Sequence, residues 1–132
     1  MDHVGWTYVP QGLTSAQLNL SYCLATYLIE DDCFVDQFTE DKVADPQRMA
    51  LAKKVGVFHD PEITAQGAKF RHSVRVDVEL SDGTRMVRTV EAARGSEKRF
   101  ARDDEIADKF DQLAARVLPD RQRAELRDAV LG

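Results

Sequence analysis

The stretch Gly12–Glu30, GLTSAQLNLSYCLATYLIE, decides the fold that the sequence predicts. Its apolar side chains recur at helical spacing and form two adjacent stripes rather than one. The first stripe holds Leu20, Cys23, Leu24, Tyr27 and Leu28, and the second holds Leu18, Tyr22, Ala25 and Ile29. Such a helix needs cover on two sides, so we expect a buried central helix, with Thr14 or Ser15 as its N-cap.

A strictly alternating segment later in the chain predicts a β-hairpin. Val74, Val76, Val78 and Leu80 alternate with Ser73, Arg75, Asp77 and Glu79, and the segment Thr84–Val90 returns after Asp82-Gly83. If Asp82 and Gly83 are the two turn residues, Val78 lies opposite Val87 and Asp77 opposite Arg88. The hairpin then has one apolar face that packs on the rest of the protein.

Two shorter apolar segments, Val4–Val9 and Val55–Phe58, predict one or two further strands. The pair Asp45-Pro46 predicts a helix start, because the aspartate accepts free N–H groups and the proline has none to lose. Apolar spacing from Asp103 onward and the pair Pro119-Asp120 predict two helices at the end of the chain. We therefore expect an α+β fold: an antiparallel sheet of three to four strands with a β-hairpin, packed against a central buried helix and carboxy-terminal helices.

Length and charge restrict the class of protein. The chain has 132 residues, which suits one domain over residues 1–132. Its 18 basic and 23 acidic residues give a net charge of −5, and the two signs are interspersed. The nearest basic cluster, Arg94 to Arg102, is diluted by Glu97 and the acids that follow, so we interpret it as a solvated surface. A nucleic-acid partner is not expected, because such binding needs concentrated basic charge.

Cys23 and Cys33 are interpreted as small, partly buried apolar residues rather than as a disulfide or a reactive thiol. No stretch reaches the eighteen apolar residues of a membrane span. The start MDHVGWTYVP has neither the basic nor the apolar region of a signal peptide. We expect a cytoplasmic protein without a membrane partner.

The residues alone predict no catalytic centre. The three histidines, His3, His59 and His72, show no metal-ligand spacing, so neither a metal nor a cofactor is expected. No glycine-flanked serine, P-loop or dinucleotide-binding motif occurs. We interpret His59 and His72 as turn residues.

A series of short motifs, taken in order, resembles the carboxy-terminal domain of the MmgE/PrpD family. The motifs are Tyr8-Val9-Pro10, Ser15–Tyr22, Asp45-Pro46, Leu51–Val55, His59–Glu62, Asp82-Gly83, Arg94-Gly95-Ser96 and Asp108-Lys109-Phe110. No single motif is specific, but the ordered set covers nearly the whole chain. Members of this family include 2-methylcitrate dehydratase and cis-aconitate decarboxylase, lyases that act on small polycarboxylates.

The resemblance implies a role as one part of a larger enzyme. Family members have a large helical domain that carries most substrate-binding and proton-moving residues, and a smaller α+β lid, with the active site between them. This chain resembles the lid alone, and the helical catalytic domain is absent from it. We therefore expect a substrate-closing domain that is inactive by itself and works with a helical MmgE/PrpD domain on a small polycarboxylate.

The resemblance also directs attention to the start of the chain. The family's tyrosine on the strand before the proline-containing loop matches Val4, so that residue type is not carried over. His3 or Tyr8 is the candidate replacement as a substrate-binding residue, and the alternative is that both are ordinary strand residues. A second hypothesis is an independent binding or interaction module that forms a homodimer through the surface that faces the helical domain in relatives. The substrate and reaction direction are not identified by the sequence.

Overall fold

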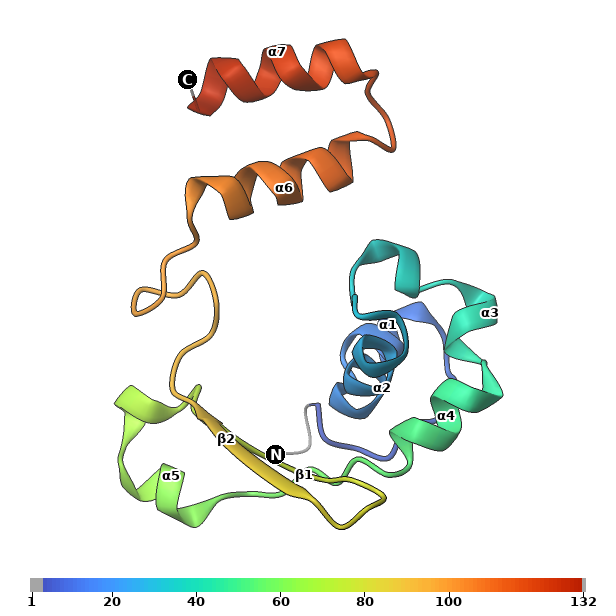
Figure 1. Ribbon diagram of the computed structural model, residues 1–132, viewed down its shortest axis with the longest axis vertical. Coiled ribbons are helices and arrows are strands. Elements are labelled where there is room, and N and C mark those ends of the chain that lie inside the picture. Colours follow the sequence, from blue (N-terminus) through green and yellow to red (C-terminus); the bar gives the residue numbers. More distant parts are fainter. Residues whose placement is uncertain (1–3, 132) are drawn as a thin grey trace. The chain divides into compact units, whose positions relative to one another are not determined.

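The structure is a computed structural model that describes residues 4–131 of the chain, and its contacts divide after Asp60 into two units (Figure 1). Unit 1, up to Asp60, contains α1 (Leu13–Gln17), α2 (Leu20–Glu30), η1 (Val35–Gln37), α3 (Glu40–Val43) and α4 (Pro46–Ala52). Unit 2, from Pro61, contains α5 (Pro61–Ala65), η2 (Ala68–Phe70), β1 (Val74–Glu79), β2 (Arg85–Val90), α6 (Asp103–Ala114) and α7 (Asp120–Leu131). The predicted α+β class is confirmed. The prediction of one domain over residues 1–132 stays a prediction.

The predicted central helix is interrupted at Asn19 and forms two helices, α1 and α2. Asn19 is fully buried, and its Oδ1 accepts a hydrogen bond from the Tyr22 N–H at 2.9 Å, which makes it the N-cap of α2. Its Nδ2 donates to the Trp6 carbonyl at 2.7 Å. The predicted N-caps Thr14 and Ser15 are wrong, because both lie inside α1. An asparagine that satisfies two backbone groups ends one helix and starts the next.

Only one side of α2 is covered within unit 1. The buried residues are Ser21, Tyr22, Ala25 and Thr26, which lie around the predicted second stripe. The predicted first stripe is half-buried at its start and exposed at its end, with Tyr27 at 53% and Leu28 at 68% exposure. The expectation of cover on two sides is therefore wrong for the elements of this unit, because α1 and α4 pack on the Tyr22 side alone.

The core of unit 1 is built around two tyrosines. Its buried members are Tyr8, Ala16, Tyr22, Ala25, Val43 and Ala52. The Tyr8 and Tyr22 rings lie 4.9 Å apart, and Phe38 lies 5.6 Å from Tyr22 on its other side. The Tyr22 hydroxyl donates to the Gln37 carbonyl at 2.7 Å, so the core contains satisfied polar groups as well as rings.

The predicted helix start at Asp45-Pro46 is confirmed. The Asp45 carboxylate accepts a hydrogen bond from the Arg48 N–H at 2.7 Å, and Pro46 is the first residue of α4. The helix ends at Ala52. Because Asp45 caps α4, it also fixes the position of Arg48 in the first turn of that helix, where the Arg48 side chain is buried within unit 1.

The sheet has two strands among the described residues, and the predicted third and fourth strands are not formed. In the segment Val4–Val9, the carbonyls of Val4 and Trp6 accept hydrogen bonds from Leu20 and Asn19 instead of from a strand. In the segment Val55–Phe58, the Val55 carbonyl accepts from the Ser21 hydroxyl at 3.4 Å. Neither segment forms a strand, and the N-cap and first residues of α2 occupy backbone groups that a sheet needs.

The hairpin of β1 and β2 is confirmed, but its predicted register is wrong by one residue. Asp77 lies opposite Val87 and Val78 opposite Met86. The loop has three residues, 81–83, closed by a 2.8 Å hydrogen bond from the Leu80 N–H to the Thr84 carbonyl. Gly83 adopts a φ of 84°, which is the left-handed position that such a loop needs at its end.

The new register changes the charge pairing on the hairpin. Asp77 accepts a hydrogen bond from Arg85 Nε at 2.8 Å, diagonally across the strands, and the predicted pair with Arg88 is not formed. Every residue of both strands is exposed, so no other described element of unit 2 covers the apolar face that the sequence predicts. The two predicted carboxy-terminal helices are confirmed as α6 and α7, which run side by side and are joined by an ion pair from Arg127 to Asp111 at 2.8 Å (Figure 1).

Candidate functional site

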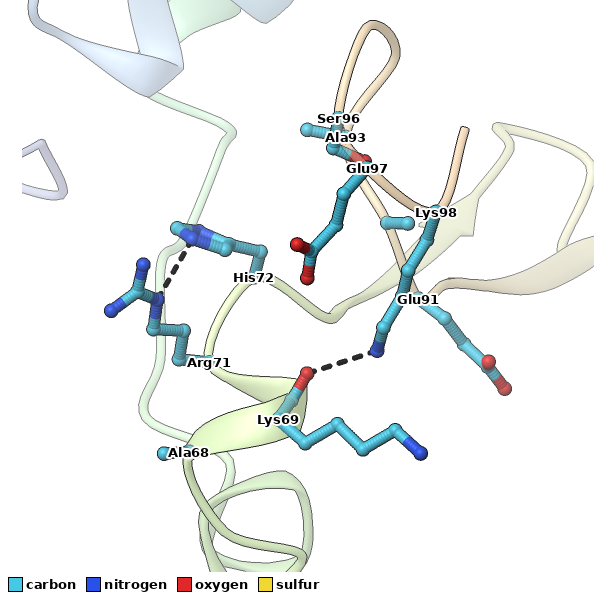
Figure 2. Close-up of a pocket in the computed structure, with 10 residues that line it drawn as sticks. Ala68, Lys69, Arg71, His72, Glu91, Ala93, Ser96, Glu97 and Lys98 are labelled. Atoms are coloured by element: carbon cyan, nitrogen blue, oxygen red, sulfur yellow. Dashed lines mark hydrogen bonds between the residues drawn. The ribbon is translucent and has the colours of Figure 1, made fainter. Parts of the chain in front are cut away.

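A cleft with a volume of about 390 Å³ lies within unit 2 (Figure 2). One wall comes from η2 and the two residues after it, and the other comes from residues 91–98, where the chain leaves β2. We call it the loop cleft. Its volume lies in the range of small-molecule sites, and its lining is mostly polar.

Local turns position the second wall of the loop cleft. Gly95 has a φ of 81°, and its N–H donates to the Arg99 carbonyl at 2.7 Å, so the chain reverses a few residues after the end of β2. The reversal brings Ser96, Glu97 and Lys98 back toward η2.

Lys98 ties the two walls together. Its Nζ donates to the Lys69 carbonyl at 3.1 Å (Figure 2). The same Nζ lies 5.0 Å from the centre of the Phe70 ring. Lys98 is an exposed residue, and these two contacts direct its ammonium group, which has further N–H donors to offer, toward the η2 wall.

Glu97 projects into the same cleft without joining Lys98. Figure 2 shows its carboxylate pointing into the space between His72 and Lys98. No ion pair joins Glu97 to a cation of the described residues. The cleft therefore offers an acceptor and a charged donor from adjacent residues that do not neutralise each other.

His72 is a cleft residue as well as the turn residue that the sequence predicts. Arg71 Nε donates to His72 Nε2 at 2.9 Å. Sequence reasoning missed Glu97 and Lys98, which it interpreted as part of a solvated surface. Gly95 was the available signal, because glycine readily adopts the positive φ of a sharp turn.

Of the two predicted substrate-binding residues, His3 lies outside the described residues and Tyr8 lies in the core of unit 1. Tyr8 is 4% exposed, and its hydroxyl donates to the Val43 carbonyl at 2.8 Å. Burial, followed by the neighbouring Tyr22, raises the pKa of Tyr8 to about 12, so it is protonated at neutral pH. Its role as a substrate contact stays a prediction.

A smaller cavity of about 220 Å³ lies beside Tyr8 within unit 1. Trp6, Thr7 and Tyr8 line one side, and Ser21, Lys53 and Val57 are among the residues that line the other. The cavity sits where the start of the chain runs over α2 and the end of α4. It gives Tyr8 an opening next to a lysine and two hydroxyl side chains.

The strongest charge cluster of unit 1 is centred on Glu30. Its carboxylate accepts hydrogen bonds from Lys42 Nζ at 2.8 Å and Gln37 Nε2 at 3.1 Å, and it pairs with Arg48. The bond from Lys42, then those from Arg48 and Gln37, lower the pKa of Glu30 to about 2. A carboxylate held ionised in this way connects helices and is not suited to proton transfer near neutral pH.

Both cysteines are free and half-buried. Burial raises the pKa of Cys23 and is the main cause that raises the pKa of Cys33 to about 12. A thiol with a raised pKa is a poor nucleophile at neutral pH. This agrees with the interpretation of both residues as packing residues.

Between residues 4 and 131, no group of three or more His, Cys, Asp or Glu side chains is arranged to hold a metal ion. In the same part of the chain, no helix combines the length and the apolar character needed to cross a bilayer.

Comparisons with known proteins give the chain a family. The family model of the MmgE/PrpD C-terminal domain matches residues 1–132. Cis-aconitate decarboxylase of Aspergillus terreus (strain NIH 2624 / FGSC A1156) is 30% identical over 98% of this chain. Another cis-aconitate decarboxylase of Aspergillus terreus is 29% identical over 99% of the chain, and the cis-aconitate decarboxylase-like protein oryM of Aspergillus oryzae (strain ATCC 42149 / RIB 40) is 27% identical over 98%.

These relatives are much longer than this chain. The matched segment makes up 27% of the length of each of the three relatives. The family model and the relatives agree in covering this chain almost from end to end. The chain therefore belongs to the MmgE/PrpD family and corresponds to the C-terminal domain of that family.

Proposed function

We propose that this chain is the substrate-closing domain, or lid, of an MmgE/PrpD-type lyase that acts on small polycarboxylates, and that it is inactive alone. The observation that carries the proposal is the match of the whole chain to the family's C-terminal domain, while it spans only 27% of relatives named for cis-aconitate decarboxylation. In this proposal, the part of those relatives that the chain does not match corresponds to the helical domain that the family resemblance implies. A 2-methylcitrate-like acid is the proposed alternative to an aconitate-like acid as substrate.

The chemistry of such a lyase explains why a lid is needed. Removing water or CO2 from a polycarboxylate requires cations or N–H groups for the carboxylates and a base whose pKa lies near neutrality in a site closed to water. The largest resolved pKa shifts in this chain lie far from neutrality: Tyr8 and Cys33 at about 12 and Glu30 at about 2. None of these three groups is suited to act as a base near neutral pH, so the proposal takes the base from another part of the enzyme.

The exposed side of α2 supports docking to a helical partner domain. On α2, Tyr27 is 53% exposed and Leu28 is 68% exposed, although the opposite side of the helix is buried. Leu18, the C-cap of α1, precedes α2 and is also 53% exposed. Exposed apolar groups gathered on one helix indicate a surface that another element covers. We assign that cover to the helical domain, because relatives carry most of their length outside the matched segment.

His3 and Tyr8 are the proposed substrate contacts at the start of the chain. The cavity beside Tyr8 supports this assignment, because Lys53 lies on its wall and supplies the cation that a carboxylate needs. The proposal requires a change of hydrogen-bond partner, because the Tyr8 hydroxyl must break its bond to the Val43 carbonyl before it can bind a ligand.

The same exposed apolar side supports a second candidate function, a homodimeric binding module. Where the helical domain is absent, a second copy of the chain is the available cover for Leu18, Tyr27 and Leu28. This candidate predicts a concentration-dependent dimer. If sedimentation analysis finds a monomer at all concentrations, the homodimer candidate is contradicted.

Association with the helical part of a relative tests the first candidate. The binding partner is Aspergillus terreus cis-aconitate decarboxylase without its matched segment, and isothermal titration calorimetry measures the affinity. We expect Leu28→Glu to weaken binding at least tenfold. The matched control is Val117→Glu, at a position 79% exposed between α6 and α7, which should bind like the unchanged chain. Equal loss in both variants, or no binding by the unchanged chain, contradicts the proposal.

A further inference from the structure

The loop cleft contains two opposite charges that leave each other unpaired. Glu97 and Lys98 are adjacent in the chain and both line the cleft, yet no ion pair joins them. Lys98 Nζ is directed to the Lys69 carbonyl at 3.1 Å, and the Glu97 carboxylate points into the space between His72 and Lys98 (Figure 2). A ligand that fills this space meets a cation on one side and a hydrogen-bond acceptor on the other.

We propose that the loop cleft binds a small hydroxycarboxylate, with Lys98 holding a carboxylate and Glu97 selecting for the hydroxyl group. The inference rests on the proposed function, because it places a polycarboxylate on this domain, and it adds the residues and the selectivity. It assigns a binding role to residues that lie wholly within unit 2.

Lys98 is suited to hold a carboxylate because it is already positioned. The hydrogen bond to Lys69 uses one of its three N–H donors, and the contact with the Phe70 ring at 5.0 Å holds the side chain over the cleft wall. Contacts that already orient an exposed side chain reduce the conformational freedom that it loses when it binds an anion. The free donors of Nζ can therefore bind a carboxylate without a rearrangement of the wall.

Glu97 sets the selectivity because it is an acceptor only. An ionised carboxylate accepts hydrogen bonds and donates none, so it binds a ligand hydroxyl and repels a second ligand carboxylate placed at the same point. Glu97 is exposed in the free chain, so its selectivity depends on how far a bound ligand displaces water from its carboxylate.

The other charges around the cleft do not cancel this arrangement. Arg71 and Lys69 add positive charge at the η2 wall, and Glu91 adds one carboxylate at the far wall. In Figure 2 the side chains of Lys69 and Glu91 point away from the space that Glu97 enters. The volume of about 390 Å³ admits a tricarboxylate with water around it.

Two ligands that differ by one hydroxyl test the inference. Citrate and tricarballylate share three carboxylates and one carbon skeleton, and only citrate carries the hydroxyl. Amide chemical shifts of the 132-residue chain, followed by NMR during titration, give both affinities and locate the binding site. We expect citrate to bind at least tenfold more tightly than tricarballylate, with the shifts centred on residues 68–72 and 91–98.

Variants separate the two roles. Lys98→Met should weaken both ligands by a similar factor of about tenfold, as expected for loss of one charged hydrogen-bond partner. Glu97→Gln should bring the two affinities within about threefold of each other, because it removes the repulsion that disfavours tricarballylate. The controls Lys109→Met on α6 and Glu125→Gln on α7 should leave both affinities unchanged.

The outcomes separate this inference from the proposed function. Equal affinities for citrate and tricarballylate, shifts centred elsewhere, or no effect of Lys98→Met overturn the inference. Activity of a chimera that joins this chain to the helical part of a relative is measured independently. An active chimera whose KM for its substrate is unchanged by Lys98→Met and by Glu97→Gln overturns the inference and is consistent with the lid role. Selective citrate binding together with an inactive chimera supports the inference and contradicts the lid role.

Discussion

Glu30, the last residue of α2, forms an ion pair with Arg48 in the first turn of α4. The Arg48 side chain is only 5% exposed, and its guanidinium also lies 6.0 Å from the centre of the Tyr22 ring. Lys42 and Gln37 bind the same carboxylate. One carboxylate therefore connects α2, η1, α3 and α4, and it compensates a cation that is otherwise buried without a charge partner.

Glu30→Gln should destabilise the protein by about 2 kcal/mol, the usual worth of a hydrogen bond to a charged group. The physical reason is that Arg48 then stays buried without a counter-charge. Urea unfolding at pH 7 measures the change in the free energy of unfolding. Glu125→Gln, on exposed α7, is the control and should change that free energy by less than about 0.5 kcal/mol. An equal effect of the two substitutions contradicts the account.

The contribution of Glu30 should depend on pH. Its pKa in the folded protein, about 2, lies below the ordinary value of 4.5, so its stabilisation is complete above that ordinary value. As the pH falls from 4.5 toward 2, the folded state loses this contribution because the carboxylate must be protonated. The gap in stability between the unchanged chain and Glu30→Gln should shrink over that range. A gap that stays constant from neutral to acid pH is the contrary result.

Asn19→Ala should cost about 2 kcal/mol, because it removes both the N-cap of α2 and the bond to the Trp6 carbonyl. Asn19→Asp keeps an acceptor for the Tyr22 N–H and loses the donor to Trp6, so it should cost about half as much. Thermal unfolding of the unchanged chain and the two variants gives their order of stability. If aspartate proves as damaging as alanine, the capping role assigned to Asn19 is wrong.

Gly83→Ala should destabilise the hairpin by about 1 kcal/mol, because a Cβ is unfavourable at positive φ. Gly83→Asn should cost less, since asparagine tolerates the left-handed region. Amide hydrogen exchange in residues 74–90 reports the loss locally. Alanine and asparagine variants with identical protection in this segment speak against the three-residue loop.

Tyr8→Phe tests the substrate contact predicted at the start of the chain. Loss of the hydrogen bond to Val43 should lower the free energy of unfolding by about 1 kcal/mol. If the hydroxyl also binds substrate, the chimera with the helical part of a relative should show a raised KM as well. A lower melting temperature with unchanged KM leaves Tyr8 with a packing role alone.

The sequence predicts elements better where one local rule acts alone. The pair Asp45-Pro46 predicts a helix start, and α4 begins at Pro46 in the structure. Helical spacing across Asn19 was misleading, because the apolar pattern continues through a residue that caps a new helix. The hairpin was predicted and its register was not, since Asp82-Gly83 suits both a two-residue and a three-residue loop.

The candidate site was harder to predict than the fold. Lys98 and Glu97 lie in a charged stretch that looks solvated, and only the reversal at Gly95 brings them to the cleft. The contacts that define the cleft join residues about thirty positions apart, as in the bond from Lys98 to Lys69 with a separation of 29. Composition and spacing contain no information about such contacts, because they depend on how a loop closes in three dimensions.

Turnover of cis-aconitate is the most direct measurement of the central claim, that this chain is one part of a two-part lyase. Three proteins are compared: the 132-residue chain alone, Aspergillus terreus cis-aconitate decarboxylase without its matched segment, and the chimera of the two. The account predicts CO2 release by the chimera alone. CO2 release by the 132-residue chain alone, or full activity of the shortened relative without any partner, would contradict it.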